Sequence, residues 1–198
     1  MKKLLMIAVA ALMVTINANA QQMFLKPMVG GTLATIVGDG TDNAKMKLGL
    51  VAGAEFGYQV MEPLAITAGA LVSMQGAGMK DHDGYTDGST TMTYLNIPIT
   101  ANYYVAPGLA LKAGVQPGFL LSNKEKYTRN GHEHENTSKD GLKKFDFSIP
   151  LGLSYEISDF VIDACYNLGL SNILDVEHSD YSQKHSVIML TLGYKIPF

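Results

Sequence analysis

The chain has 198 residues, of which 47% are hydrophobic and only 17% are charged, and its formal net charge is -3. This length fits one domain, and the mild acidity argues against nucleic acid as a partner. The single cysteine, Cys165, excludes an intramolecular disulfide, so the fold must be stable without one.

The first residues have the pattern of a secretory signal peptide. Lys2 and Lys3 give a positive start, residues 4–16 form an apolar run, and 18–20 are a small-residue cleavage site. The apolar run is too short to span a bilayer as a helix. We therefore expect a signal peptide at 1–20 and a single mature domain at 21–198.

Alternating apolar and polar residues, typical of β-strands, recur along the rest of the chain. We expect eight strands, at 23–35, 48–60, 64–77, 93–105, 109–122, 144–157, 160–171 and 185–198. Tight turns at 61–63, 106–108 and 158–159 alternate with long polar segments at about 36–47, 78–92, 123–143 and 172–184. This rhythm predicts an all-β fold, an eight-stranded antiparallel up-and-down transmembrane β-barrel with short periplasmic turns and long extracellular loops.

The two faces of these strands differ in chemistry. One is apolar and lacks charge, which predicts contact with membrane lipid, whereas the other is small or polar. Seven inward glycines (49, 53, 57, 114, 118, 152 and 169) fit a narrow interior that side chains fill, which argues against an open pore. The inward face also carries a predicted charge network of Lys26, Glu55, Lys112, Asp146, Glu156, Asp163 and Lys195. Because buried charges must be paired, we expect a cross-strand ion pair, most plausibly Lys195 with Asp163.

Aromatic residues mark the predicted membrane boundary. Tyr58, Tyr103, Tyr155 and Tyr194 lie on the apolar face just before a short turn or the C-terminus, and form the expected periplasmic girdle. Phe119 and Phe145 could contribute to the outer girdle. Pro98, Pro117 and Pro150 fall within strands, where we expect bulges.

The last strand ends on an apolar ladder at every second residue, up to Phe198. This strand must close the barrel by pairing with the first. A terminal ladder of this kind resembles the signal by which barrel-assembly machinery recognises its clients, so we assign Phe198 to assembly. An ordinary edge strand with this pattern would expose an apolar edge to aggregation.

Several segments resemble the PorT-like outer-membrane β-barrel domain family. They are "TYLNIPITANYYV" (93–105), "AGVQPGFLLS" (113–122), "FDFSIPLGLSYEI" (145–157), "YNLGLSNI" (166–173) and "LTLGYKIPF" (190–198). The resemblance covers most of the mature chain and implies an eight-stranded outer-membrane barrel without a defined activity. A few members of that family are linked to protein secretion across the envelope.

The long loops carry the remaining candidate chemistry. His132-Glu133-His134-Glu135 could contribute metal ligands, helped by Asp81-His82-Asp83 or by Asp175 and His178, but the ligand spacing is not that of a metal motif. A loop-mouth hydrolase or acyltransferase could use a His with an Asp and a Ser, since Ser89, Ser122, Ser138 and Asp140 are nearby. Polar loops contain such residues in any case, so we predict no catalytic, metal or cofactor site.

The sequence therefore predicts an outer-membrane barrel of structural or interaction type. Its expected partners are outer-membrane lipid, the barrel-assembly machinery during biogenesis, and an extracellular or envelope protein at the surface loops. Two alternatives stay open, a barrel enzyme that acts at its loops and a secreted soluble β-barrel.

Overall fold

The computed structural model describes residues 23–79, 85–129, 132–175 and 181–198. The expected signal peptide lies outside these residues. No helix in the described part of the chain has the length and apolarity needed to cross a membrane.

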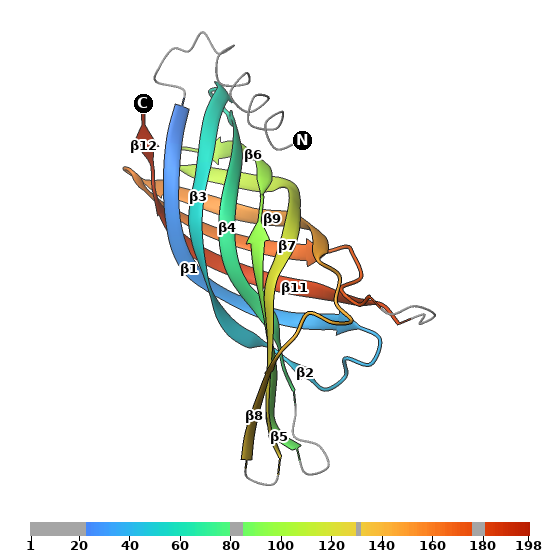
Figure 1. Cartoon of the computed structure of the whole chain (residues 1–198). Helices are drawn as coiled ribbons and strands as arrows, with labels where there is room; N and C mark the ends of the chain where they lie inside the picture. Colours follow the sequence, from blue (N-terminus) through green and yellow to red (C-terminus); the bar gives the residue numbers. More distant parts are fainter. Residues whose placement is uncertain (1–22, 80–84, 130–131, 176–180) are drawn as a thin grey trace, which may run out of the picture.

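The described residues form one antiparallel, up-and-down sheet of twelve strands. The strands are β1 (Met23–Gly38), β2 (Ala44–Lys45), β3 (Lys47–Met61), β4 (Leu64–Met79), β5 (Tyr85–Asn96), β6 (Ile99–Ala106), β7 (Leu109–Arg129), β8 (His132–Thr137), β9 (Phe145–Ile157), β10 (Phe160–Gly169), β11 (Gln183–Tyr194) and β12 (Ile196–Pro197). The ends of the sheet meet, because β11 pairs with β1 from Met28–Gly193 to Gly38–Gln183. The strands therefore curve around a common interior (Figure 1).

The count of twelve differs from the expected eight because several strands are pieces of one longer strand. β5 and β6 both lie between β4 and β7, and the pairs Leu71–Asn96 and Ala68–Ile99 keep one register across Pro98. β12 continues β11 in the same register against β1. β2 continues β3 along β4, and β8 pairs with β7 alone. Eight positions around the ring remain once these pieces are joined.

The prediction of bulges at the mid-strand prolines is wrong. The register of β9 against β10 is the same on both sides of Pro150, and that of β7 against β9 is the same on both sides of Pro117. Pro98 lies between the end of β5 at Asn96 and the start of β6 at Ile99, and the register continues unchanged across it. A proline removes one N–H donor from the ladder, and here the strand loses that bond without gaining an extra residue.

Two segments expected as loops are largely strand. β5 begins at Tyr85, β7 continues to Arg129, and β8 pairs with the last residues of β7. β5, β7 and β8 project beyond the ring, away from the end where the chain terminates (Figure 1). We call residues 85–91, 124–129 and 132–137 the strand extension. The sequence of these segments is mostly polar, so it lacks the apolar–polar alternation that marks a half-buried strand.

Burial is inverted relative to a water-soluble protein. Large apolar side chains on the outer face are exposed, for example Leu48 at 79% and Leu50 at 65%, whereas the inward carboxylate Glu55 is only 2% exposed. The inward face also buries a small apolar layer of Met28, Ala34, Val51, Leu71, Val187 and Met189. Soluble domains bury their large apolar residues and expose their charges.

The inward glycines are required by the narrow interior. A Cβ atom at any of the seven predicted positions would approach another atom to less than 3.0 Å. At Gly114 it would lie 2.0 Å from the carbonyl oxygen of Ile99. At Gly57 it would lie 2.0 Å from the ring of Phe24. Neighbouring strands and side chains already occupy the space that a side chain would need.

Candidate functional site

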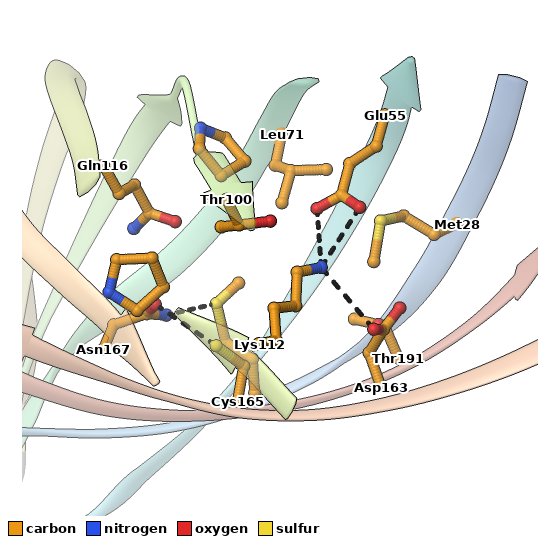
Figure 2. Close-up of a pocket in the computed structure, with 13 residues that line it drawn as sticks. Met28, Glu55, Leu71, Thr100, Lys112, Gln116, Asp163, Cys165, Asn167 and Thr191 are labelled. Atoms are coloured by element: carbon orange, nitrogen blue, oxygen red, sulfur yellow. Dashed lines mark hydrogen bonds and ion pairs between the residues drawn. The ribbon is translucent and has the colours of Figure 1, made fainter. Parts of the chain in front are cut away.

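Four buried charges from four strands form an ion cluster in the interior. Lys26 on β1 places Nζ 2.9 Å from Glu55 on β3 and 2.7 Å from Asp163 on β10. Lys112 on β7 reaches the same two carboxylates at 2.9 and 3.5 Å. Figure 2 shows Lys112 between Glu55 and Asp163. The formal charges of the four groups cancel, as a buried cluster requires.

Small neighbours make room for this cluster. Lys26 lies directly opposite Glu55 on the adjacent strand, so this pair follows from register alone. On its other side Glu55 lies opposite Gly69. Lys112 lies opposite Gly152, which has no side chain to block the lysine as it crosses the interior. Glu55 and Lys112 therefore each have a glycine as one cross-strand neighbour.

The other three residues of the predicted network do not join this cluster. Lys195 pairs with Glu156 at 3.0 Å, and Glu156 also accepts a hydrogen bond of 2.5 Å from Tyr104. The prediction that Lys195 pairs with Asp163 is therefore wrong. Asp163 lies opposite Thr191 on β11. At the rise of a β-strand, Thr191 and Lys195 are about 13 Å apart along the chain.

Asp146 lies in a third place, towards the long-loop end of the interior. Its carboxylate accepts a 2.5 Å hydrogen bond from the hydroxyl of Ser171. The same hydroxyl accepts the backbone N–H of Phe147 at 2.7 Å. Asp146 is only 6% exposed, so Ser171 supplies a partner to a carboxylate that water hardly reaches. The structure thus separates the seven predicted residues into three groups at different depths.

Side chains fill the interior beside the ion cluster. The remaining cavity has a volume of about 20 Å³, which is room for about one water molecule. Its walls include Met28, Leu71, Lys112 and Cys165 (Figure 2), and also Met189. Cys165 is thus one wall of a small cavity.

A second layer closes the interior at the long-loop end. Ile173 inserts a fully buried side chain against Met92, Tyr94 and Leu120. The Tyr94 hydroxyl lies 3.3 Å from Nε2 of His185, and the two rings make a T-shaped contact with centroids 5.3 Å apart. Leu142 of the third long segment also packs against this layer, so the third and fourth segments cap the interior.

No motif in the sequence marks Tyr94, His185 or Ile173 as a functional residue. Tyr94 and His185 lie on the inward face of strands whose residues alternate between apolar and polar. The alternation therefore could have predicted that both side chains point inward. Ile173 follows the last expected residue of its strand and lies in a loop. Its N–H donates to the carbonyl of Gln183 at 2.8 Å, and its own carbonyl accepts from Lys143 at 2.9 Å. Its inward position depends on these contacts between loops.

The strand extension carries exposed charges of both signs. Glu135 on β8 pairs with Lys124 at 2.5 Å and with Lys126 at 3.0 Å. Hydrogen bonds from these two lysines lower the pKa of the Glu135 carboxyl. On β7 and β8, Tyr127 and His134 stack with ring centroids 5.3 Å apart. An open, polar pocket of about 270 Å³ adjoins these residues.

Some of the candidate metal and catalytic residues lie near one another: Ser89, Glu133, His134 and Glu135 line the same open pocket. No group of three His, Cys, Asp or Glu residues in the described part of the chain could hold a metal ion. Residues 81–83 and 178 lie outside the described residues. Ser138 donates to Asp140 at 2.8 Å.

The four tyrosines of the predicted girdle lie at one end of the ring. Tyr103, Tyr155 and Tyr194 are 53%, 48% and 42% exposed, and Tyr58 is half-buried. Each lies within a few residues of a short turn or of the C-terminus. Their cross-strand partners are Ile66 for Tyr58, Leu64 for Tyr103, Leu109 for Tyr155 and Phe160 for Tyr194. Towards the long-loop end, Phe119 and Phe145 make a T-shaped contact on the outer face.

Residues 10–175 match the family model described as the outer membrane protein beta-barrel domain. The chain belongs to this family. It is therefore a transmembrane β-barrel protein of the cell outer membrane, and its exposed apolar face lies in a lipid environment. Residues 1–9 and 176–198 lie outside the match.

Among solved structures, the fold is similar to that of Ail, the attachment invasion locus protein of Yersinia pestis. The TM-score is 0.51 at 16% identity, with 88% of this chain and 99% of Ail covered. Neisserial surface protein A gives 0.47 at 11% identity, with 89% and 97% covered. OprG from Pseudomonas aeruginosa gives 0.43 at 14% identity, with 89% and 97% covered. A comparison with curated proteins found no match. At these identities, the similarity to Ail shows the fold alone.

Proposed function

We propose that this protein is an eight-stranded transmembrane barrel with a sealed interior that serves as a scaffold and presents the strand extension to a partner. The short turns and the C-terminus face the periplasm in this proposal, and the long loops and the extension face outward. The residues before the barrel, 1–20, act as a signal peptide. Kinship with the PorT-like family rests on the strand motifs alone.

The filled interior is the observation that carries this proposal. The buried charges pair with one another in the ion cluster. The cavity beside them has a volume of only about 20 Å³, and the Ile173 layer closes the long-loop end. The exposed strand extension is the part of the described chain that reaches furthest from the ring (Figure 1). A binding role at this surface, without catalysis, accounts for both features.

A sealed interior predicts that the protein does not conduct ions. We expect the purified protein, reconstituted in planar bilayers, to give no stepwise current, because side chains fill an eight-stranded lumen. A general porin in the same bilayers serves as the positive control. Reproducible single-channel steps from this protein would contradict the sealed scaffold.

The partner-binding role is tested by site-specific photo-crosslinking in cells. A photoreactive residue at Glu133, in the extension, should give an adduct with one protein species. The same residue at Asp42, an exposed position in the first long loop, should not. Replacing Glu135 with Lys places three positive charges together and should abolish the adduct. Equal labelling from both positions, or labelling that survives Glu135→Lys, would contradict a binding role for the extension.

We also propose that Phe198 and the terminal ladder guide assembly of the barrel. Deleting Phe198, or replacing Phe198 and Tyr194 with Ser, should slow insertion and expose the chain to periplasmic proteolysis. Leu111→Ser and Leu153→Ser, at outward positions of internal strands, serve as the matched control. The readout is the heat-modifiable folded fraction in outer membranes. A folded yield equal to the control's would remove the assembly role.

A further inference from the structure

A groove crosses the outer face beside the seam where the first and last strands meet. Its volume is about 390 Å³, and its floor consists of the small or ring-shaped residues Pro27, Ala52 and Gly53. Val29, Phe160 and Tyr194 stand beside this floor and are 61%, 53% and 42% exposed. The groove is thus a shallow depression between large apolar side chains on the outer face.

The strand ladder is interrupted at the same place. Pairing of β1 with β11 stops at Met28–Gly193 and resumes with β12 at Leu25–Ile196. Pro27 has no N–H to donate across this gap. The buried ion pair of Lys26 with Asp163 lies on the inner side, so the groove has a closed floor.

The two ends of the groove differ in polarity. Phe160 and Tyr194 make a T-shaped pair, with ring centroids 5.2 Å apart. The Tyr194 hydroxyl donates to Asp159 in the adjoining short turn at 3.2 Å. The opposite end, at Val29 and Leu192, is apolar and exposed. A polar boundary that leads into an apolar groove matches the junction of a lipid head group with its chain.

We propose that one acyl chain of a phospholipid from the periplasmic leaflet occupies this groove as a bound lipid. The groove is continuous with the exposed apolar surface of an outer-membrane barrel, so lipid is the molecule that meets it. A chain that fills the groove makes more close contacts than one that lies on a convex wall of Leu and Ile. The inference does not depend on what the strand extension binds.

The test compares two equivalent substitutions on the outer face. Ala52→Leu fills the groove, whereas Ala164→Leu adds the same side chain on β10 at another exposed, outward position. The full chain is expressed, purified in mild detergent and analysed by native mass spectrometry. We expect the wild type and Ala164→Leu to retain a single phospholipid, and Ala52→Leu to retain about tenfold less, because the groove is then overpacked.

Each other outcome would overturn the proposal. Equal retention by Ala52→Leu and Ala164→Leu would mean that lipid binds elsewhere. Equal loss from both would indicate a non-specific lipid shell. A lipid-free dimer that Ala52→Leu converts to a monomer would assign the groove to a second copy of the chain. Heat-modifiable migration of both variants verifies that each barrel is folded.

Discussion

Replacing Lys112 with Met should lower the free energy of unfolding by about 3–5 kcal/mol, because it leaves buried carboxylate charge without its cationic partner. Glu55 and Asp163 would then share Lys26 as their cationic partner among the described residues of the cluster. Both carboxylates are about 2% exposed, so water hardly replaces the lost ammonium group. The measurement is denaturant unfolding of the barrel in lipid vesicles, followed by tyrosine fluorescence or by gel mobility.

Two controls separate charge from packing in this experiment. Lys126→Met makes the same chemical change on the exposed strand extension and should leave unfolding unchanged, since surface ion pairs contribute little. The double variant Lys112→Met with Asp163→Asn leaves Lys26 and Glu55 as a neutral pair. It should therefore be more stable than the sum of the single effects predicts. Additive effects in the double variant would show that the four charges do not act as one cluster.

Replacing Gly114 with Val should prevent the barrel from closing, at a cost of about 3 kcal/mol or more. The first added carbon would meet the backbone of the neighbouring strand, 2.0 Å from the Ile99 oxygen and 2.7 Å from the Cα of Thr100. Backbone atoms cannot turn aside as the end of a flexible side chain can. We expect the heat-modifiable folded form to be lost from the outer membrane, with degradation in the periplasm.

Ala113→Val provides the matched control. Ala113 is the preceding residue on β7, and its side chain is exposed on the outer face. The same enlargement there points into lipid and should leave the folded yield unchanged. If Gly114→Val folded as well as Ala113→Val, the interior would be wider than the structure shows, and the sealed scaffold would have to be abandoned.

The sequence alone determined the strands within the ring and the chemical character of their two faces. The alternating residues of 144–157 predicted β9 to within one residue, and the tight turns at 62–63, 107–108 and 158–159 lie where turn residues occur. Alternation is a local property with a period of two, so it can be read without knowing which strands are neighbours. The inward glycines were also readable, because a small barrel admits only small residues at many positions.

Only the tertiary structure decided which residues meet across the interior. Lys195 was expected to pair with Asp163, but the register placed Lys195 beside Glu156 and left Asp163 to Lys26 and Lys112. The stagger between strands sets the depth of every side chain, and a list of strand segments does not contain it. The strand extension and the inward position of Ile173 could not be predicted from the sequence for a related reason. Backbone pairing outside the apolar band and contacts between loops hold them, and neither leaves a periodic pattern in the sequence.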